Sequence, residues 1–397
     1  MELSELAAPA DSKILLIVID GLGGLADATS GTELEEASTP NLDRLATEGA
    51  TGLLEPVGPG ITPGSGPGHL ALFGYDPWAY QLGRGVLSAA GLDVDLRPGD
   101  VAARANLCTI ADDGTVADRR AGRPADEDAR RVVDRLSAGV HVDGVDAGFH
   151  HERGHRLLVV WRGEGLDPRV ADTDPQHDGL APLEPEALDP AAERMAAVAA
   201  ATIAEARRVL ADDPIANGLL LRGFDSHREL PALHDRTGLR AAAIAVYPMY
   251  RGVARLLGFE VLGPPLDLAE EVELLGKHWG DADFFFFHHK DADAAGEDGN
   301  RAAKIAAIER LDAVVPDLLA LEPDVIAVSG DHSTPSQMAA HSWHPVPVVV
   351  RGRLVGRDEV DRFGERWCRA GGLGYRPTMQ LLPILMANAG RLAKYGA

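Results

Sequence analysis

The chain has 397 residues, a formal net charge of −23 and two cysteines, Cys108 and Cys368. The length is enough for two domains with complete cores, and the acidic balance excludes nucleic acid and an acidic membrane as partners, because both need a basic face. The cysteines show neither a metal-binding spacing nor a disulfide framework. With no signal-peptide pattern and no apolar run of bilayer length, the sequence predicts a cytoplasmic protein.

The N-terminal part alternates strand and helix patterns. Residues Ile14–Ile19 form a continuous apolar run that is typical of a buried parallel strand, and Asp20 follows it directly. Ser38-Thr39-Pro40 predicts a helix start, with a capping hydroxyl and a proline in the first turn. A Gly/Pro-rich turn spans residues 58–68 and leads into another expected helix. Ser65 is therefore expected near a helix N-terminus, where backbone N–H groups favour an anion.

The middle of the chain, residues 105–255, has a different character. Residues 106–110, 156–163 and 219–223 have strand-like patterns, and the alanine-rich stretch 189–211 predicts a helix. Central-strand character returns after about Glu270. We therefore expect a smaller α+β domain that is inserted into a sheet begun by the N-terminal segment and finished by the C-terminal one.

The C-terminal part returns to central-strand character. Phe284–Phe287 and Val325–Ser329 are apolar runs, and each leads into a segment with several acidic or histidine residues. Alternation of such strands with helices predicts a mostly parallel sheet flanked by helices, an α/β fold. Residues 1–104 and 256–397 are expected to form this core in two parts.

Carboxylates and imidazoles follow three of the predicted strands. Because open α/β sheets bind ligands at the carboxyl ends of their strands, we expect these groups to converge on one or two divalent metals. A serine beside such metals could attack a phosphate, since a metal lowers the pKa of the hydroxyl that it binds. The candidates are Asp20, Ser65, Asp293, Glu297, Asp331, His332 and His341.

Each candidate also has an ordinary structural explanation. An aspartate after a strand is often a cap or turn residue. The pair Asp293 and Glu297 could be one solvated helix face, and Ser65 could serve only the turn. Chance is a much weaker explanation for three separate strand ends that each carry a carboxylate.

The positive charge is almost entirely arginine, because only five of the 38 basic residues are lysines. Arg162 and Arg222 each end an apolar run, which directs a guanidinium group off the sheet edge. Arginine binds phosphate and carboxylate oxygens bidentately. The pattern therefore indicates an anionic ligand, although each arginine taken alone could belong to a charged surface.

Short motifs extend this picture from about Lys13 to the C-terminal helix. The segments are Ile17–Gly21, Ser38–Asp43, Pro63–Ser65, His69–Pro77, Gly83–Val86, Asp118–Arg123, Asp172–Pro175, Leu221–Gly223 and Gly330–Pro335. Together they resemble the archaeal-type cofactor-independent (2,3-bisphosphoglycerate-independent) phosphoglycerate mutases of the alkaline phosphatase superfamily. The resemblance implies that superfamily's sheet with an inserted domain.

The resemblance also implies a two-metal phosphoryl-transfer site that interconverts 3-phosphoglycerate and 2-phosphoglycerate. Ser65 would be the nucleophile that carries a phosphoserine intermediate, and Lys290 would lie beside the phosphoryl group. The ions would be Mn²⁺ or Mg²⁺, with Co²⁺ or Zn²⁺ as further candidates. One ion would be held by Asp20, Ser65, Asp331 and His332, and the other by Asp293, Glu297 and His341.

The same resemblance implies a small phosphorylated acid as the substrate and leaves the oligomeric state open. Arginines, mostly of the inserted domain, would hold the acid while it reorients. The residues that would bind the substrate are Arg119, Arg120, Arg123, Arg156, Arg222, Arg251 and His69.

Several positions depart from the family pattern. Glu297 stands where a histidine ligand is usual, Gly66-Pro67 follows the serine in place of Asp-Thr, and His344 could act as a substitute ligand. These departures keep two alternatives open. One is a metal-dependent phosphomonoesterase or phosphonate-processing enzyme that acts on another small phospho-acid, and the other is a non-catalytic protein that binds a phospho-acid.

Overall fold

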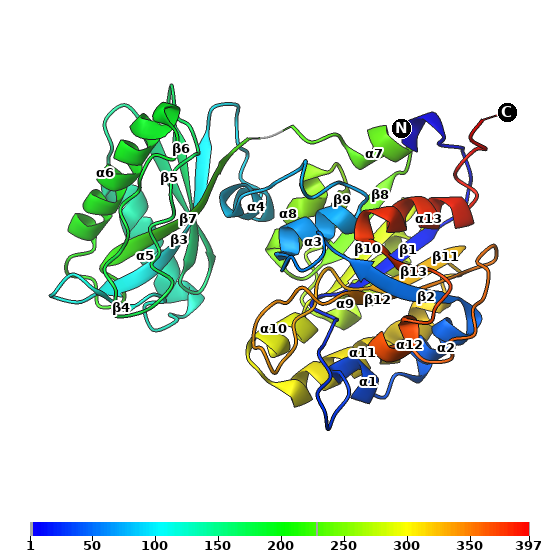
Figure 1. Cartoon of the computed structure of the whole chain (residues 1–397). Helices are drawn as coiled ribbons and strands as arrows, with labels where there is room; N and C mark the ends of the chain where they lie inside the picture. The colour runs from blue at the N-terminus through cyan, green and yellow to red at the C-terminus, as the bar shows by residue number, and fades with distance from the viewer. Residues whose placement is uncertain (1–2, 228, 397) are drawn as a thin grey trace. The chain divides into compact units, whose positions relative to one another are not determined.

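The computed structural model describes residues 3–227 and 229–396. The chain forms two compact units, whose elements are labelled in Figure 1. Unit 1 combines Met1–Gln81 with Leu230–Ala397, and unit 2 is the segment Leu82–Glu229. Unit 2 is therefore an insertion within the sequence of unit 1.

Unit 1 is built on an eight-stranded sheet. Neighbouring strands are parallel except at β12, which runs antiparallel to both β11 and β2. The predicted fold class, a mostly parallel α/β sheet flanked by helices and carrying a smaller inserted unit, is confirmed. The strand order is β13 (Gly374–Pro377), β2 (Ala50–Glu55), β12 (Val346–Gly352), β11 (Val325–Ser329), β1 (Ile14–Ile19), β10 (Phe284–His289), β8 (Ala241–Ala245) and β9 (Glu260–Leu262).

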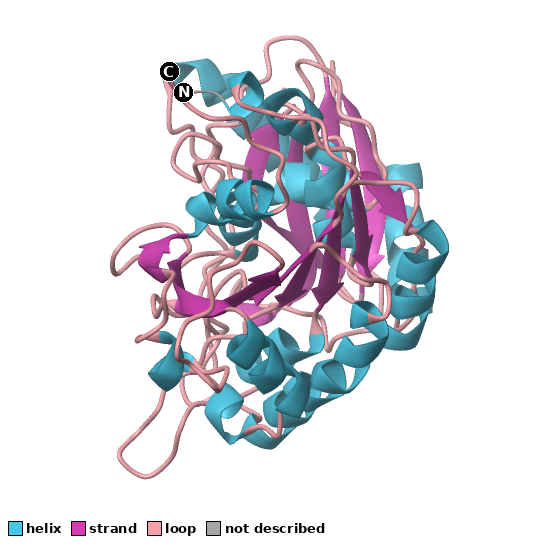
Figure 2. Ribbon diagram, turned by 90° about the vertical axis from the view of Figure 1, so that its right-hand side faces the viewer, coloured by secondary structure: helices cyan, strands magenta, loops and turns pink. Residues whose placement is uncertain are grey.

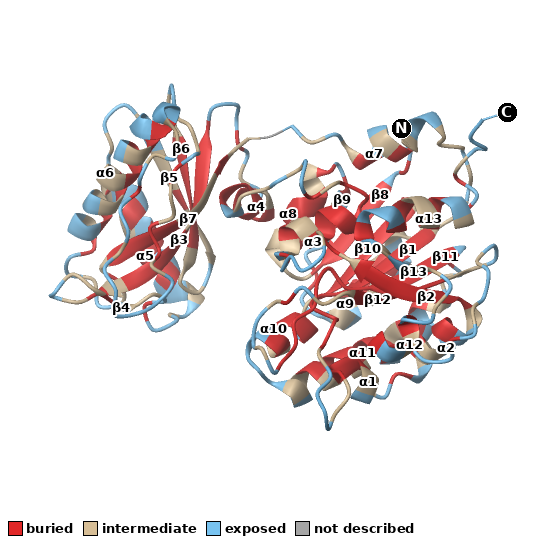
Figure 3. Cartoon of the chain, viewed as in Figure 1, coloured by how far each residue is buried: buried red, intermediate tan, exposed pale blue. Residues whose placement is uncertain are grey.

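The central strands are buried on both faces, as their uninterrupted apolar sequences predict. Every residue of β1, β10 and β11 is buried, and the strands stand out in red in Figure 3. Leu15 and Ile17 of β1 share one core with Leu45 of α2 and Leu311 of α11. On the opposite face, Phe286 of β10 packs edge-on against the ring of Phe73, which follows α3.

Helices therefore cover both faces of this sheet (Figure 2). Two 3₁₀ turns, Leu3–Glu5 and Thr378–Gln380, also belong to unit 1. The α-helices of unit 1 are α1 (Glu33–Glu36), α2 (Pro40–Glu48), α3 (Ser65–Leu72), α7 (Leu233–Thr237), α8 (Pro248–Leu256), α9 (Leu268–His278), α10 (Asp291–Glu297), α11 (Arg301–Leu319), α12 (Glu365–Cys368) and α13 (Leu381–Asn388).

Unit 2 is an antiparallel sheet with its own helices and its own core. Strand β3 pairs with β4, β6 and β7, and β6 pairs with β5. Helices α5 and α6 contribute Val132 and Met195 to a core that contains Ala103 and Val159 of the sheet. The elements are α4 (Arg84–Gly91), β3 (Val101–Ile110), β4 (Val116–Asp118), α5 (Asp126–Gly139), β5 (Asp146–Arg153), β6 (Arg156–Arg162), the 3₁₀ turn Pro190–Ala192, α6 (Glu193–Val209) and β7 (Gly218–Ser226).

The inserted unit spans residues 82–229, whereas the sequence placed the insertion at 105–255. At the first boundary, α4 belongs to unit 2 because it packs against β3 and β7. At the second, β8 pairs in parallel with β10, so the strand Ala241–Ala245 and the helix α8 after it belong to unit 1. Sequence periodicity alone does not indicate which sheet a short apolar strand joins.

Cys108 and Cys368 are both buried free thiols. Within residues 3–227 and 229–396, no helix combines the length and the apolar character that crossing a membrane requires.

Candidate metal centre

Three neighbouring parallel strands deliver polar side chains to one edge of the sheet in unit 1. Asp20 follows β1, and Asp331 and His332 come shortly after β11. Strand β10 leads through Lys290 into α10, which carries Asp293. Because β1 lies between β10 and β11 and runs parallel to both, the carboxyl ends of all three strands lie side by side.

A first group of possible metal ligands consists of Asp20, Asp331 and His332. Nε2 of His332 lies 3.1 Å from Oδ2 of Asp331 and 3.4 Å from Oδ1 of Asp20. All three side chains are fully buried. Burial alone would raise the pKa of Asp20, but the ammonium of Lys290 and the ring of His288 hold that pKa well below its usual range. The group therefore offers ionised carboxylate oxygens next to an imidazole nitrogen.

A second group consists of Asp293, His332 and His341. Oδ1 of Asp293 lies 3.5 Å from Nε2 of His341 and 4.0 Å from Nδ1 of His332. The two imidazole rings stack with their centroids 3.7 Å apart, and Nδ1 of His341 is hydrogen-bonded to the carbonyl oxygen of Pro63 over 3.0 Å. His332 therefore borders both groups, whereas the resemblance places it in the first group alone.

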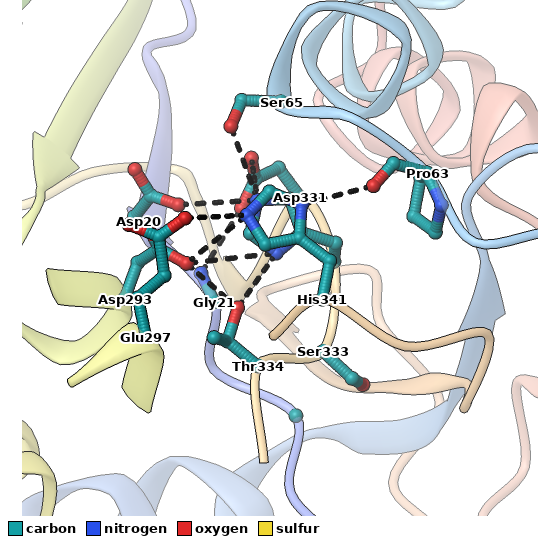
Figure 4. A network of polar contacts seen from close by, with 12 residues as sticks. Asp20, Gly21, Pro63, Ser65, Asp293, Glu297, Asp331, Ser333, Thr334 and His341 are labelled. Atoms are coloured by element: carbon teal, nitrogen blue, oxygen red, sulfur yellow. Dashed lines mark hydrogen bonds and ion pairs between the residues drawn. The ribbon is translucent and has the colours of Figure 1, made fainter. Parts of the chain in front are cut away.

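Ser65 is the first residue of α3 and follows the N-cap residue Gly64. Its Oγ lies 3.2 Å from Nε2 of His332. Figure 4 shows the hydroxyl of Ser65 pointing toward the side chains of the ligand groups. A Cβ at Gly68 would lie 2.3 Å from the carbonyl oxygen of Asp331, so only glycine lets α3 approach the loop after β11 this closely. The serine hydroxyl is thus held beside the first ligand group at a helix N-terminus, where anions are favoured.

Lys290 supplies a positive charge between the two groups. Its Nζ lies 3.1 Å from Oδ2 of Asp20 and also forms an ion pair with Oδ2 of Asp293. These carboxylates raise the pKa of Lys290 well above its ordinary value, although burial opposes the shift. The ammonium also lies 5.5 Å from the ring centroid of Tyr250. Lys290 is therefore ionised at any physiological pH.

Two fully buried histidines lie behind the carboxylates of the first group. Nδ1 of His69 is 3.2 Å from Oδ2 of Asp331 and 2.8 Å from the carbonyl oxygen of Ser65. Nε2 of His288 is 3.4 Å from Oδ2 of Asp20. These contacts hold Asp331 and the start of α3 in place through His69, whose role in substrate binding stays a prediction. His288 lies in β10, the strand that leads to Lys290, and no motif in the sequence marks it.

Glu297 lies at the rim of the second group. Its Oε1 is 3.6 Å from Nε2 of His341, and its side chain is 55% exposed. Burial opposes protonation of His341, but Glu297 and Asp293 together raise the pKa of that ring to about 9. Glu297 is therefore close enough to interact with the group electrostatically, and its exposed side chain has room to change conformation.

His344 lies apart from both ligand groups among the described residues. Its Nδ1 is hydrogen-bonded to Oγ of Ser342 over 2.9 Å, and its ring stacks on Trp343. These contacts give His344 a structural explanation within its own loop, and nothing in the geometry favours a role as a substitute ligand.

The chemistry of the two groups fits divalent cations. Both carboxylate oxygens of Asp20 and Oδ2 of Asp331 are buried and accept no hydrogen bond from the described residues, although they make the ion-pair contacts given above. Buried charged oxygens are costly unless they are paired or bind a metal. Carboxylate oxygens and imidazole nitrogens together suit ions such as Mn²⁺, Zn²⁺ and Co²⁺, and Mg²⁺ prefers the carboxylates.

In unit 2, strand alternation gathers arginines on one face of the sheet. Arg104 of β3 lies opposite Arg222 of β7, and Asn106 of β3 lies opposite Arg156 of β6. The intervening residue Ala105 belongs to the core under α5 and α6. Because side chains alternate between the two faces of a strand, the three arginines share the face opposite to that core.

Arg84, the first residue of α4, adds a fourth guanidinium group. A Cβ at Gly223 would lie 2.7 Å from the Cβ of Arg84, so α4 packs closely on β7. Burial, followed by the charges of Arg222 and Arg104, lowers the pKa of Arg84 to about 10. Carboxylates balance part of this charge, because Arg104 pairs with Glu152 over 3.0 Å and Arg222 with Asp174 over 3.4 Å. An anion bound among the guanidinium groups would relieve the repulsion that remains.

The turn Asp118–Arg123 presents further arginines. It contains three consecutive residues with positive φ, between 47° and 70°, and the carboxylate of Asp118 accepts the N–H groups of Arg120 and Gly122 over 2.7 Å each. Arg119 donates two hydrogen bonds, of 2.7 and 2.8 Å, to the carboxylate of Asp174. Arg119 is therefore engaged in anchoring the turn, which leaves the other arginines of the turn as the better candidates for binding an anion.

The set of arginines differs in part from the one expected. Arg251 lies on α8 in unit 1, where it donates to the carbonyl oxygen of Val246 over 3.3 Å. Arg84 and Arg104 were not singled out, although both belong to the group in unit 2. The available signals were the Gly83–Val86 motif for Arg84 and, for Arg104, its place two residues before Asn106 on the same strand face.

Comparisons with known proteins fit this geometry. Residues 46–216 match a family model described as 2,3-bisphosphoglycerate-independent phosphoglycerate mutase. A relative from Thermus thermophilus, named as a probable enzyme of this kind, is 52% identical over 100% of this chain and 98% of its own. This chain belongs to that family. A family member from Aquifex aeolicus with the same name is 46% identical over 100% of this chain and 99% of its own.

Solved structures of similar proteins agree with this membership. A protein from Pyrococcus horikoshii has 31% sequence identity, covers 97% of this chain and 99% of its own, and superposes with a TM-score of 0.83. A cofactor-independent phosphoglycerate mutase from Thermoplasma acidophilum has 31% identity, covers 96% of this chain and 100% of its own, and has a TM-score of 0.69. The family expected from the sequence motifs is thereby confirmed.

Proposed function

We propose that this chain interconverts 3-phosphoglycerate and 2-phosphoglycerate by transferring the phosphoryl group to Ser65 and back. The observation that carries the proposal is the position of Oγ of Ser65, which is 3.2 Å from Nε2 of His332 and next to two groups of potential metal ligands. The names of the relatives from Thermus and Aquifex support the same activity.

Two divalent ions are part of the proposal, with Mn²⁺ or Mg²⁺ as the first choice and Co²⁺ or Zn²⁺ as alternatives. When bound, the ions lower the pKa of the serine hydroxyl and neutralise the charge that develops on the transferred phosphoryl group. Glu297 would have to turn its exposed side chain toward its ion. The residues that would hold the two ions are Asp20, Ser65, Asp293, Glu297, Asp331, His332 and His341.

The covalent steps then exchange one ester for another. The hydroxyl of Ser65 loses its proton and Oγ forms a bond to phosphorus while the bond between phosphorus and the 3-oxygen of the substrate breaks, and the 3-oxygen gains a proton. In the second step, the 2-hydroxyl of the bound glycerate loses its proton and attacks the phosphoserine; the bond between Oγ and phosphorus breaks, and Oγ regains a proton. The ammonium of Lys290 and the N-terminus of α3 provide positive potential for the phosphoryl oxygens.

The arginine-bearing face of unit 2 is the proposed binding surface for the carboxylate of the acid. Burial lowers the pKa of Arg84 most, the neighbouring guanidinium groups of Arg222 and Arg104 lower it further, and a bound anion would offset their repulsion. Replacing Arg84 or Arg156 by glutamine should raise the KM for phosphoglycerate and leave metal binding unchanged. The arginines of this surface are Arg84, Arg104, Arg120, Arg123, Arg156 and Arg222.

The test is a coupled assay of metal-stripped protein with 3-phosphoglycerate, to which Mn²⁺, Mg²⁺ or Co²⁺ is added back. Both 2-phosphoglycerate and free phosphate are followed. We expect metal-dependent formation of 2-phosphoglycerate without matching release of phosphate. Ser65→Ala should lower turnover by about 10³-fold or more, while the exposed Ser38→Ala serves as a control that keeps full activity.

Other outcomes separate the alternatives. Release of free phosphate in place of isomerisation would indicate a phosphomonoesterase. Full activity of Ser65→Ala would refute the serine as the nucleophile. Binding of phosphoglycerate without phosphorylation of Ser65 and without turnover would indicate a binding protein.

A further inference from the structure

We propose that Lys304 is a positioning residue for the metal centre, because its ammonium group ties together the two loops that carry metal ligands. This inference rests on the metal site proposed above. Lys304 lies within α11, and its side chain is fully buried in unit 1. A buried ammonium is costly unless its hydrogen bonds and its charge are satisfied, so its contacts show what it holds in place.

The ammonium of Lys304 donates to one carbonyl oxygen in each of two loops. It bonds the carbonyl oxygen of Gly23 over 2.9 Å and that of Thr334 over 2.8 Å. Gly23 lies in the loop after β1, three residues beyond Asp20, and Thr334 lies in the loop after β11, two residues beyond His332. One side chain thus bonds both of the loops that supply the first ligand group.

Thr334 extends this link to the second ligand group. Its Oγ1 donates to Oδ1 of Asp293 over 2.7 Å and lies 3.0 Å from Nδ1 of His332. Figure 4 shows Thr334 next to Asp293 in this network. A shift of Thr334 would therefore move a ligand of each group.

Glycines let the backbone segments of this region approach closely. A Cβ at Gly23 would lie 1.8 Å from Oγ of Ser333, and one at Gly296 would lie 2.4 Å from the carbonyl oxygen of Thr334. The N–H of Thr334 also donates directly to the carbonyl oxygen of Gly23 over 3.0 Å. The hydrogen bonds from Lys304 therefore add a buried side-chain link to a backbone contact that already joins the two loops.

Two buried glutamates also contact Lys304 or the loops that it joins. Oε2 of Glu33 lies 3.9 Å from Nζ of Lys304, and its Oε1 accepts the N–H of Ser336 over 2.8 Å. Oε1 of Glu365 accepts the N–H of Gly24 over 2.8 Å. Both glutamates are buried. The loops after β1 and β11 are thus anchored to α1, α11 and α12 by one buried polar network.

The test measures metal binding directly in the full-length chain. Mn²⁺ affinity is determined by calorimetry, and the absorption spectrum of bound Co²⁺ reports the ligand geometry. We expect Lys304→Met to weaken Mn²⁺ binding by about 10-fold to 100-fold, the usual effect of losing a residue that orients ligands, and to change the Co²⁺ spectrum. Lys304→Arg, which keeps the charge and the donors, should recover part of the affinity. Lys277→Met, at an exposed position of α9, is the matched control and should bind as the wild type does.

Three results would speak against the proposal in different ways. If the wild type binds neither ion, the metal site itself is refuted, and the role of Lys304 with it. If the wild type binds and folded Lys304→Met binds as tightly with the same Co²⁺ spectrum, only the role of Lys304 is overturned. Should Lys304→Met fail to fold, Lys304→Gln keeps two N–H donors without the charge; failure of both variants to fold would assign Lys304 to overall stability and also overturn the proposal.

Discussion

At the scale of single residues, the imidazole of His332 connects the parts of the candidate site. One of its nitrogens faces Asp20, Asp331 and the hydroxyl of Ser65, and the other faces Asp293. Because both ring nitrogens have polar neighbours, the tautomer of His332 and its ring orientation are fixed together. A change at either group is therefore transmitted to the other through one ring.

Glu297 gives a prediction at this scale. Its carboxylate stands where the family usually has a histidine, and it reaches Nε2 of His341 at 3.6 Å from an exposed position. Since the exposed side chain has room, we expect Glu297→His to keep Mn²⁺-dependent turnover within about threefold, because imidazole and carboxylate both bind Mn²⁺. Steady-state turnover and calorimetric Mn²⁺ affinity are the measurements.

Asp298→His, at the next exposed position, is the control for simply adding an imidazole near the site. A collapse of Mn²⁺ affinity in Glu297→His, with Asp298→His unchanged, would contradict the prediction. Glu297 would then be a ligand that this chain requires in its carboxylate form.

At the scale of elements, α9 carries a buried acid that the proposed chemistry does not use. Glu271 is 1% exposed, and its Oε1 has no hydrogen-bond partner among the described residues. Burial, with smaller contributions from Asp291 and Asp267, raises the pKa of Glu271 to about 9. The side chain is therefore protonated in the folded chain at neutral pH.

This raised pKa predicts how the stability of unit 1 depends on pH. The unfolded carboxyl titrates near its ordinary value of 4.5 and the folded one near about 9, so the folded state binds more protons between these values. The stabilisation of the folded state by the proton on Glu271 is fully present below about pH 4.5 and is lost as the pH rises toward 9. Glutamine does not titrate. As the pH rises from about 5 to about 8, we expect the unfolding free energy of Glu271→Gln to increase by roughly 1–3 kcal/mol relative to that of the wild type. This is a discounted fraction of the ~1.4 kcal/mol that each pKa unit represents.

Urea unfolding of both proteins at the two pH values measures this difference. Glu273→Gln, at an exposed position of the same helix, controls for losing a carboxylate from α9. If the wild type and Glu271→Gln keep a constant difference in unfolding free energy across this range, Glu271 has an ordinary pKa and the prediction fails.

At the scale of the whole molecule, each of the two units has a hydrophobic core of its own. The core of unit 1 contains side chains from both ends of the sequence, such as Leu15 and Ile326, whereas that of unit 2 is formed within residues 82–229 alone. A unit whose core lies within one continuous segment meets the main condition for independent folding.

We therefore expect a fragment of residues 82–229 to fold by itself. It should show the far-ultraviolet circular dichroism of a mixed α/β fold and a cooperative urea transition. Trp161→Ala in the fragment is the control, because this fully buried ring belongs to the unit 2 core and its loss should cost about 3–5 kcal/mol. A fragment without a cooperative transition would show that unit 2 needs unit 1 in order to fold.

Much of the fold could be predicted from local patterns. The apolar runs at Ile14–Ile19 and Val325–Ser329 are strands β1 and β11 of the central sheet, and the turn before Ser65 leads into a helix as expected. These features depend on residues close together in sequence, so periodicity and turn chemistry reveal them. The assignment of Ala241–Ala245 to the inserted domain differed from the structure, because short apolar strands fit either sheet equally well.

The sequence by itself determined the chemical groups, the strand ends that carry them and the motifs that define the family. Only the tertiary structure decided that His332 borders both ligand groups, that Lys304 joins two of their loops, and that Arg84 and Arg104 belong with Arg222. The physical reason is the separation of these residues along the sequence. Each of these contacts depends on the pairing of strands or the packing of helices that are far apart in the chain, and sequence periodicity carries no information about that register.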